Sequence, residues 1–192
     1  MTDHNQTLLY KKITGFTDIA PESINKLFEI TVATDLKKGK LILREGRVCK
    51  TIVFVEKGYL RTYVEKDGVE INTDFTFENN FTTNLKSLRS NLASDTNIIT
   101  GEDSTIFEFD KDKLLDLYKV SPEFESFGRK LLEQLLITQE EHSNLFKIYS
   151  PTERYNYILQ HNPLLLQRVS LSQLASYLGV TRETLTRIRR KK

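Results

Sequence analysis

The chain has few of the residues that most often bind metals or form disulfides. Of its 192 residues one is a cysteine, Cys49, and three are histidines, His4, His142 and His161. A single thiol cannot form an internal disulfide, hold an iron–sulfur cluster or build a cysteine-based zinc site. The three histidines do not have the spacing of metal ligands. The sequence therefore predicts no metal site and no cofactor of these kinds.

Membrane segments and enzyme signatures are also missing. No apolar run approaches the ~18 residues needed to span a bilayer, and the opening MTDHNQTLLYKK has no apolar signal core. We find no Ser/His/Asp or Cys/His arrangement and no glycine-rich phosphate loop ahead of a helix. We therefore expect a protein of the cytoplasm that makes no membrane contact and is not an enzyme.

The net charge of +2 conceals an uneven distribution. From Pro151 onward there are eight Arg or Lys and two Glu, a charge of +6 that leaves −4 for the first 150 residues. Such asymmetry indicates a basic module that meets a polyanion, joined to an acidic module that does not. A solvated basic tail is the simpler alternative.

Strand-like segments occupy the first part of the chain after about 35 residues that read as short helices. Between Thr34 and Asp110, short alternating runs are punctuated by glycines, and the pair Asp67-Gly68 favours a two-residue hairpin turn. These runs are KLILREG, TIVFVEKG, YLRTYVEKDG, VEINTDFTF, TNIITGE and STIFEFD. Short strands at regular spacing predict a small barrel or sandwich, with Phe75 and Phe77 in its core.

A long helix is predicted after this sheet region. An apolar stripe with 3–4 spacing runs through Phe124, Phe127, Leu131, Leu132, Leu135, Leu136, Leu145 and Ile148. This face exceeds what one small barrel would cover, so the helix over residues 123–149 is predicted to pair with a second copy in a homodimer. An ordinary helix packed within one chain is the alternative. His142 is expected at the rim of the dimer.

The last unit, RVSLSQLASYLGVTRETLTRIRRKK, has the spacing of a helix-turn-helix. Ser170 and Gln173 have capping-box spacing, Gly179 stands where a helix would end in a left-handed residue, and Thr181 can cap a second helix. Small and apolar anchors follow in order at Ala175, Leu185 and Ile188. This order is typical of a helix-turn-helix rather than of a generic helical hairpin.

The outward face of the second helix carries the residues expected to touch DNA. Arginine can grip a guanine edge and glutamate can accept from cytosine, so base contacts are predicted for Arg182, Glu183 and Arg187. For Glu183, stabilisation of the helix N-terminus is the alternative. Phosphate or other backbone contacts are predicted for Thr181, Thr186, Arg190 and Lys191.

With these motifs the chain resembles the CRP/FNR family of bacterial transcription regulators over nearly its whole length. The resemblance implies an α+β fold. A β-roll sensor with N-terminal helices, similar to a cyclic nucleotide-binding domain, would span residues 1–120. A dimerisation helix would span 121–149 and a helix-turn-helix domain, with no or minimal wing, 150–192. It also implies a homodimer on double-stranded DNA, base contacts by Arg182, Glu183 and Arg187 at TGTGA-like half-sites, and RNA polymerase as a further partner.

The resemblance also implies an effector pocket, which here is degenerate. Family members that bind cyclic nucleotides use a Gly-Glu pair and an Arg-Ser or Arg-Thr pair around the phosphate. By spacing, the first pair falls near Asn79 and Asn80, beside Phe81, and the second near Ser94 and Asp95. An aspartate there would repel a phosphate, so cyclic AMP is not expected and the effector is unknown. The alternative function is a ligand-binding sensor with weak or no specific DNA binding.

Overall fold

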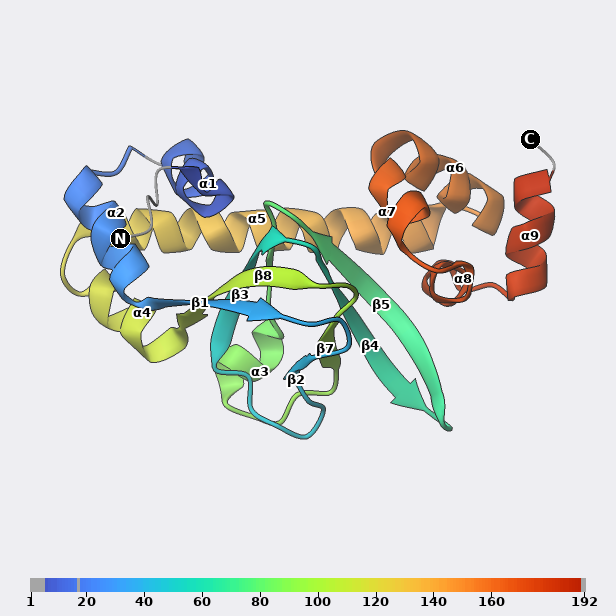
Figure 1. Cartoon of the computed structure of the whole chain (residues 1–192), viewed down its shortest axis with the longest axis horizontal. Coiled ribbons are helices and arrows are strands. Elements are labelled where there is room, and N and C mark those ends of the chain that lie inside the picture. Colours follow the sequence, from blue (N-terminus) through green and yellow to red (C-terminus); the bar gives the residue numbers. More distant parts are fainter. Residues whose placement is uncertain (1–5, 17, 191–192) are drawn as a thin grey trace.

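The computed structural model describes residues 6–16 and 18–190, and it is organised along one long helix. This helix, α5 (Pro122–Ile148), extends through the middle of the molecule along its long axis in Figure 1. A β-roll with α1 (Leu8–Phe16), α2 (Pro21–Glu29) and α4 (Lys111–Tyr118) lies toward its beginning. Four short helices lie toward its end: α6 (Pro151–His161), α7 (Pro163–Arg168), α8 (Leu171–Leu178) and α9 (Arg182–Arg190).

Two four-stranded antiparallel sheets form the roll, which confirms the predicted α+β class. One sheet has the order β1-β8-β3-β6 and the other β2-β7-β4-β5. Their strands are β1 (Thr31–Leu36), β2 (Leu41–Leu43), β3 (Thr51–Lys57), β4 (Tyr59–Lys66), β5 (Val69–Phe77), β6 (Phe81–Thr82), β7 (Asn97–Thr100) and β8 (Ser104–Asp110). The β4–β5 hairpin turns at Asp67 and Gly68, both with positive φ, as the Asp-Gly pair predicts.

Three elements lie where the sequence indicated none. The first strand begins at Thr31, inside the segment read as helical, because it pairs along its whole length with β8. The two-residue strand β6 and the helix α3 (Leu85–Ser90) occupy the polar interval before Asn97. Asn84 begins α3 by accepting a hydrogen bond from the backbone N–H of Ser87, an N-cap that a polar sequence readily supplies.

The apolar stripe of α5 is divided between the chain's own core and its surface. Phe124, Phe127 and Leu131 are buried against the roll and the N-terminal helices. Leu132 and Leu136, further along, are 41% and 59% exposed. The roll therefore covers only the first part of the stripe, as expected for a helix longer than its domain. Over residues 6–16 and 18–190, no helix has both the length and the apolarity that crossing a bilayer requires.

A second core joins the C-terminal helices to the roll. Its buried members from the roll are Tyr59, Phe75 and Phe77, and its members from the helices include Leu165, Leu174, Leu178, Leu185 and Ile188. Phe81, in contrast, belongs to the main core beneath the first sheet. Phe75 and Phe77 are thus buried in a core, as predicted. They pack against the C-terminal helices as well as against the sheet.

Candidate DNA interface and sensor pocket

Three local features determine where α8 begins, where it ends and where α9 begins. Ser170 accepts from the backbone N–H of Gln173 at 3.3 Å and so begins α8. Gly179 ends that helix with φ +68°, a left-handed conformation that costs a residue with a Cβ free energy. The Thr181 hydroxyl then accepts from the backbone N–H of Thr184 at 3.2 Å, at the start of α9. Ala175, Leu185 and Ile188 are buried, as the helix-turn-helix spacing predicts.

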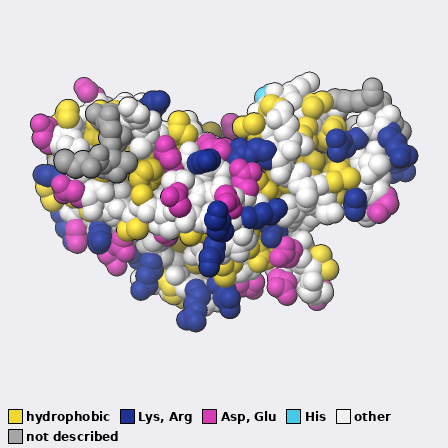
Figure 2. All heavy atoms as spheres, in the orientation of Figure 1, with side chains coloured by type: hydrophobic (Ala, Val, Ile, Leu, Met, Phe, Trp, Pro, Cys, Tyr) yellow, Lys and Arg dark blue, Asp and Glu magenta, His cyan; other side chains and the backbone are white. Residues whose placement is uncertain are grey.

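The opposite face of α9 gathers the predicted DNA-contacting residues on the surface. Thr181, Arg182, Glu183, Arg187 and Arg190 are all exposed. Figure 2 shows lysine and arginine side chains clustered at the end of the molecule that α9 forms. The structure therefore brings these side chains together on one exposed helical face.

Two members of the predicted set differ from the rest, and a third, Lys191, lies outside the described residues. Thr186 is half-buried, and its hydroxyl donates to the carbonyl oxygen of Arg182 at 2.9 Å. Glu183 is held ionised, because hydrogen bonds from its own backbone N–H and from Thr181, together with the Arg182 charge, lower its pKa. The helix N-terminus thus contributes to the position of Glu183, while its exposure leaves it free to meet a ligand.

The helix-turn-helix is docked on the β4–β5 hairpin through α8. The backbone N–H of Asn72 donates to the Ser176 hydroxyl at 3.0 Å, and that hydroxyl donates to the Glu70 carbonyl oxygen at 3.2 Å. Phe75 and Tyr177 meet edge to face with their ring centroids 5.4 Å apart. The position of α9 relative to the roll is consequently fixed by direct contacts, in addition to the covalent connection through α5.

Arg168, at the end of α7, makes the main ionic contact between the two units. Its guanidinium donates to both carboxylate oxygens of Glu78 at 2.8 Å and forms a second ion pair with Glu102. It also lies over the rings of Tyr59 and Phe77, 5.6 and 5.2 Å from their centroids. Planar, bidentate pairing of this kind is among the stronger ionic contacts in proteins. We refer to Arg168, Glu78 and Glu102 as the Arg168 clasp.

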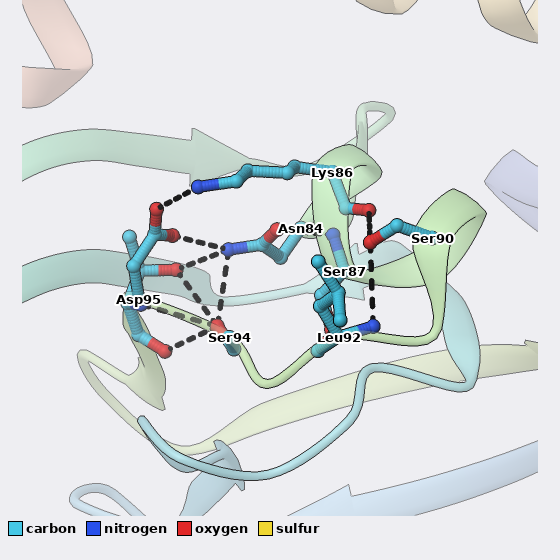
Figure 3. Close-up of polar contacts among 8 residues, drawn as sticks. Asn84, Lys86, Ser87, Ser90, Leu92, Ser94 and Asp95 are labelled. Carbon is cyan, nitrogen blue, oxygen red and sulfur yellow. Dashed lines mark hydrogen bonds and ion pairs between the residues drawn. The ribbon is translucent and has the colours of Figure 1, made fainter.

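A network centred on Asn84 occupies the predicted phosphate region (Figure 3). The Asn84 amide nitrogen lies 3.0 Å from each of its acceptors, the Ser94 hydroxyl, an Asp95 carboxylate oxygen and the Thr96 hydroxyl. Lys86 pairs with the other Asp95 oxygen at 3.2 Å. Hydrogen bonds from Asn84 and Lys86 lower the pKa of Asp95, so its carboxylate is charged. Asn84, Lys86, Asp95 and Thr96 line a cavity of about 560 Å³, the sensor pocket, whose other side is formed by α5.

Asn79 and Asn80 do not join that network. They form the turn between β5 and β6, where the Asn79 N–H donates to the Val55 carbonyl oxygen at 2.9 Å and the Asn80 carbonyl accepts from the Val55 N–H at 3.1 Å. The structure thus brings Ser94 and Asp95 together with Asn84 and Lys86, with Phe81 at the edge of the same pocket. The sequence signal for Asn84 was its spacing to Ser87, which is that of a helix cap.

His142 is half-buried and packs against its own chain, and its place at the rim of a dimer stays a prediction. Its ring packs against Phe146 and Tyr177, with centroids 4.8 and 5.5 Å away, and it faces Asp74 on β5. Burial raises the pKa of Asp74 and lowers the pKa of His142, and the charge of each partner offsets part of the other's shift. The sequence could not indicate this pair because its members come from a strand and a helix that meet only in the folded chain.

One sequence-family comparison identifies the roll. The profile described as "Cyclic nucleotide-binding domain" matches residues 33–121. No curated protein matches the chain by sequence. The match covers β1 to the start of α5 and so includes the sensor pocket residues contributed by the roll.

Solved structures share the fold over most of the chain. FixK2 from Bradyrhizobium japonicum has a TM-score of 0.69 at 19% identity, with 84% of each chain covered. CLP, a c-di-GMP responsive global regulator from Xanthomonas campestris, has a TM-score of 0.66 at 20% identity, covering 90% of this chain and 91% of that one. A Eubacterium rectale protein described as a regulator of the crp/fnr family has a TM-score of 0.65 at 18% identity, covering 91% and 83%. At these identities the likeness establishes a common fold.

Proposed function

We propose that this chain, whose residues 33–121 match the model of a cyclic nucleotide-binding domain and whose fold is shared with solved CRP/FNR regulators, is a homodimeric, sequence-specific DNA-binding transcription regulator. The observation that carries the proposal is the exposed face of α9, where Arg182, Glu183 and Arg187 project from a well-anchored helix-turn-helix. A helix of this kind fits the major groove. RNA polymerase is a further partner that this function implies.

Each residue of that face has a role in the proposal. Arg182, Glu183 and Arg187 contact base edges, because guanidinium and carboxylate groups match the donor and acceptor patterns of guanine and cytosine. Arg190 and the Thr181 hydroxyl lie nearer the ends of the face and contact phosphates, with Thr186 between them. Lys191, outside the described residues, is assigned the same role. The Glu183 carboxylate lowers the attraction of this face for DNA phosphates. Its presence among arginines therefore favours contacts to bases over attraction to the phosphate backbone alone.

Dimer formation follows from the uncovered part of α5. Leu132, Leu136, Ile137 and Ile148 are between 41% and 67% exposed on a helix whose earlier turns are buried in the chain's own core. Pairing of two such helices would bury these side chains and would place two α9 helices on successive major grooves. The sensor pocket would then lie beside the dimer helix of each chain.

The effector of this regulator is not a cyclic nucleotide that binds through its phosphate. In the sensor pocket the Asp95 carboxylate already accepts the hydrogen bonds of Asn84 and Lys86 that a phosphate would need. A phosphate beside this carboxylate would meet repulsion, and among the described residues Lys86 is the only lysine or arginine that lines the pocket.

Fluorescence anisotropy tests the proposed function. We expect the protein to prefer a palindrome of two TGTGA-like half-sites over a scrambled duplex near physiological salt, with or without cyclic AMP. Arg187→Ala should lose ~1–3 kcal/mol of discrimination at one base pair, whereas Arg190→Ala should weaken binding evenly and reduce the salt slope by about one. Equal losses on specific and random DNA for both variants would contradict base reading. If no preference for any sequence emerges from a random DNA pool, the sensor-only alternative holds.

A further inference from the structure

A second cavity lies where the sensor, the long helix and the C-terminal helices meet. Its volume is about 460 Å³, and its walls come from β5, α5, α6 and the end of α8. We call it the junction cavity. It adjoins the sensor pocket, because Asp74 and His142 line both. A molecule bound there would touch the roll, α5 and the helices that lead to α9.

The charges around the junction cavity are of one sign. Three carboxylates, those of Asp74, Glu78 and Glu141, line it, and no Lys or Arg of the described chain does so. Glu78 is already paired with Arg168, Asp74 faces His142, and Glu141 forms no ion pair within the described residues. The carboxylates of Asp74 and Glu141 would repel a phosphate or carboxylate ligand and attract a cation.

Polar groups inside the cavity also have unused hydrogen-bonding capacity. Tyr177 is only 8% exposed and lines the cavity, and burial together with the nearby Asp74 charge raises the pKa of its hydroxyl. The Nε2 atom of His142 is buried and has no hydrogen-bond partner within the described part of the chain. Buried polar atoms without partners are rare in native proteins and mark places where a ligand or water completes the bonding.

The remaining walls are aromatic and aliphatic. The lining includes the aromatic residues Phe77, Tyr157 and Tyr177 and the aliphatic residues Leu145 and Ile158. Aromatic faces attract ammonium groups, most strongly when the cation leaves water on binding. A half-buried carboxylate, a buried phenol and aromatic walls together match the chemistry of an amine with an apolar body.

We propose that the junction cavity is the effector site and that it binds an organic ammonium compound, with the cationic nitrogen between Asp74 and Tyr177. The apolar part of the ligand contacts Phe77 and Ile158. The effect on DNA binding rests on the proposed function, whereas binding of the cation does not.

Calorimetric titration of the full chain, without DNA, tests the site. The probe is phenethylamine, compared with its neutral counterpart 2-phenylethanol and with phenylacetate. We expect the amine to bind about tenfold or more tightly than the alcohol, a difference of ~1.4 kcal/mol, and phenylacetate not to bind. Equal binding of amine and alcohol, or no binding of the amine, overturns the proposal.

Matched variants locate the cation. Asp74→Asn and Tyr177→Phe should each weaken amine binding, the first about tenfold and the second severalfold. Lys86→Ala, which alters only the sensor pocket, should leave it unchanged. Should Asp74→Asn fail to fold, Glu141→Gln replaces it, because Glu141 is exposed and lines the junction cavity but not the sensor pocket. Unchanged binding in Tyr177→Phe together with either carboxylate variant would refute the assignment.

The regulatory consequence is tested separately. DNA affinity measured at saturating amine should differ from that without it, and the affinity for the amine should change by the same factor when DNA is bound. Binding of the amine with no change in DNA affinity would refute the proposed regulation and leave the proposed cation site standing. Binding of the amine by a chain that binds no DNA would refute the proposed function and leave the cation site intact.

Discussion

The Arg168 clasp should contribute a large share of the stability that couples the helix-turn-helix to the sensor. The Arg168, Glu78 and Glu102 side chains are 22%, 27% and 38% exposed, so the ion pairs are mostly, not fully, removed from water. Breaking a well-buried pair from one side costs ~3–5 kcal/mol, and an exposed pair costs well under ~1 kcal/mol. With this burial we expect Arg168→Ala to lower the free energy of unfolding by about 3 kcal/mol.

Thermal and urea denaturation measure this loss. A chain of this size loses about 2–4 °C of melting temperature for each ~1 kcal/mol, so Arg168→Ala should melt roughly 6–12 °C below the wild type. Arg168→Lys retains the charge but not the bidentate geometry, so its melting temperature should lie between those of Arg168→Ala and the wild type. Lys37→Ala is the matched control, because its ion pair with Asp103 is 84% and 61% exposed and should not measurably affect melting.

A double-mutant cycle decides whether the clasp itself is responsible. Glu78→Gln and Arg168→Ala should each destabilise, and the double variant should lose less than their sum by ~1–2 kcal/mol. Additive losses, or an Arg168→Ala protein as stable as the wild type, would refute the reasoning.

The clasp also predicts a specific acid sensitivity. Burial raises the pKa of Glu78, but hydrogen bonds from Arg168 and from the Gly58 backbone N–H outweigh it and hold the pKa below its ordinary value. A carboxylate with a lowered pKa contributes stability that is complete above the ordinary value and is lost as pH falls through the lowered one. The difference in stability between wild type and Arg168→Ala should therefore shrink on acidification. A constant difference across that range would exclude Glu78 as the partner responsible.

Three further outcomes are expected. Gly179→Ala should cost about 1 kcal/mol in urea unfolding, because φ is +68° there, and an unchanged midpoint would contradict the assigned turn. Leu136→Asp should convert a dimer to a monomer in light scattering, whereas Leu92→Asp, at 62% exposure outside α5, should not; a monomeric wild type would refute dimerisation. Cyclic AMP should not raise the melting temperature, and a rise abolished by Lys86→Ala would show that the sensor pocket accepts a phosphate despite Asp95.

Local patterns account for the parts of the fold that the sequence predicted well. The caps at Ser170 and Thr181 and the glycine at 179 act within four residues of themselves, so their spacing alone identifies the turn. The same holds for the Asp67-Gly68 hairpin, where both residues need positive φ. In contrast, β6 is two residues long and exists because β3 pairs with it, which is information that its own sequence does not contain.

The sensor pocket was predicted only in part for a related reason. Ser94 and Asp95 were found by spacing from a strand that the sequence defines clearly. The facing residues were not, because the segment from Asn79 to Asn84 contains a turn, a short strand and a helix cap in quick succession. The prediction placed the facing residue at Asn80, which forms a turn against Val55. The residue that contacts Asp95 is Asn84, four positions later.

The charge asymmetry of the chain, read at first as the mark of a polyanion-binding module, has a second physical consequence in the fold. Arg168 was counted among the basic residues after Pro151, yet it is directed inward to Glu78 and Glu102 of the acidic part, 90 and 66 positions away. Part of the opposite charge on the two halves therefore attracts them to each other, and the arginines of α9 are the part left exposed. Glu78 pairs with Arg168 and also lines the junction cavity. The contact that fixes the helix-turn-helix and the cavity proposed for the effector thus share a carboxylate, so under the proposal a ligand in the cavity would alter the electrostatic surroundings of Arg168.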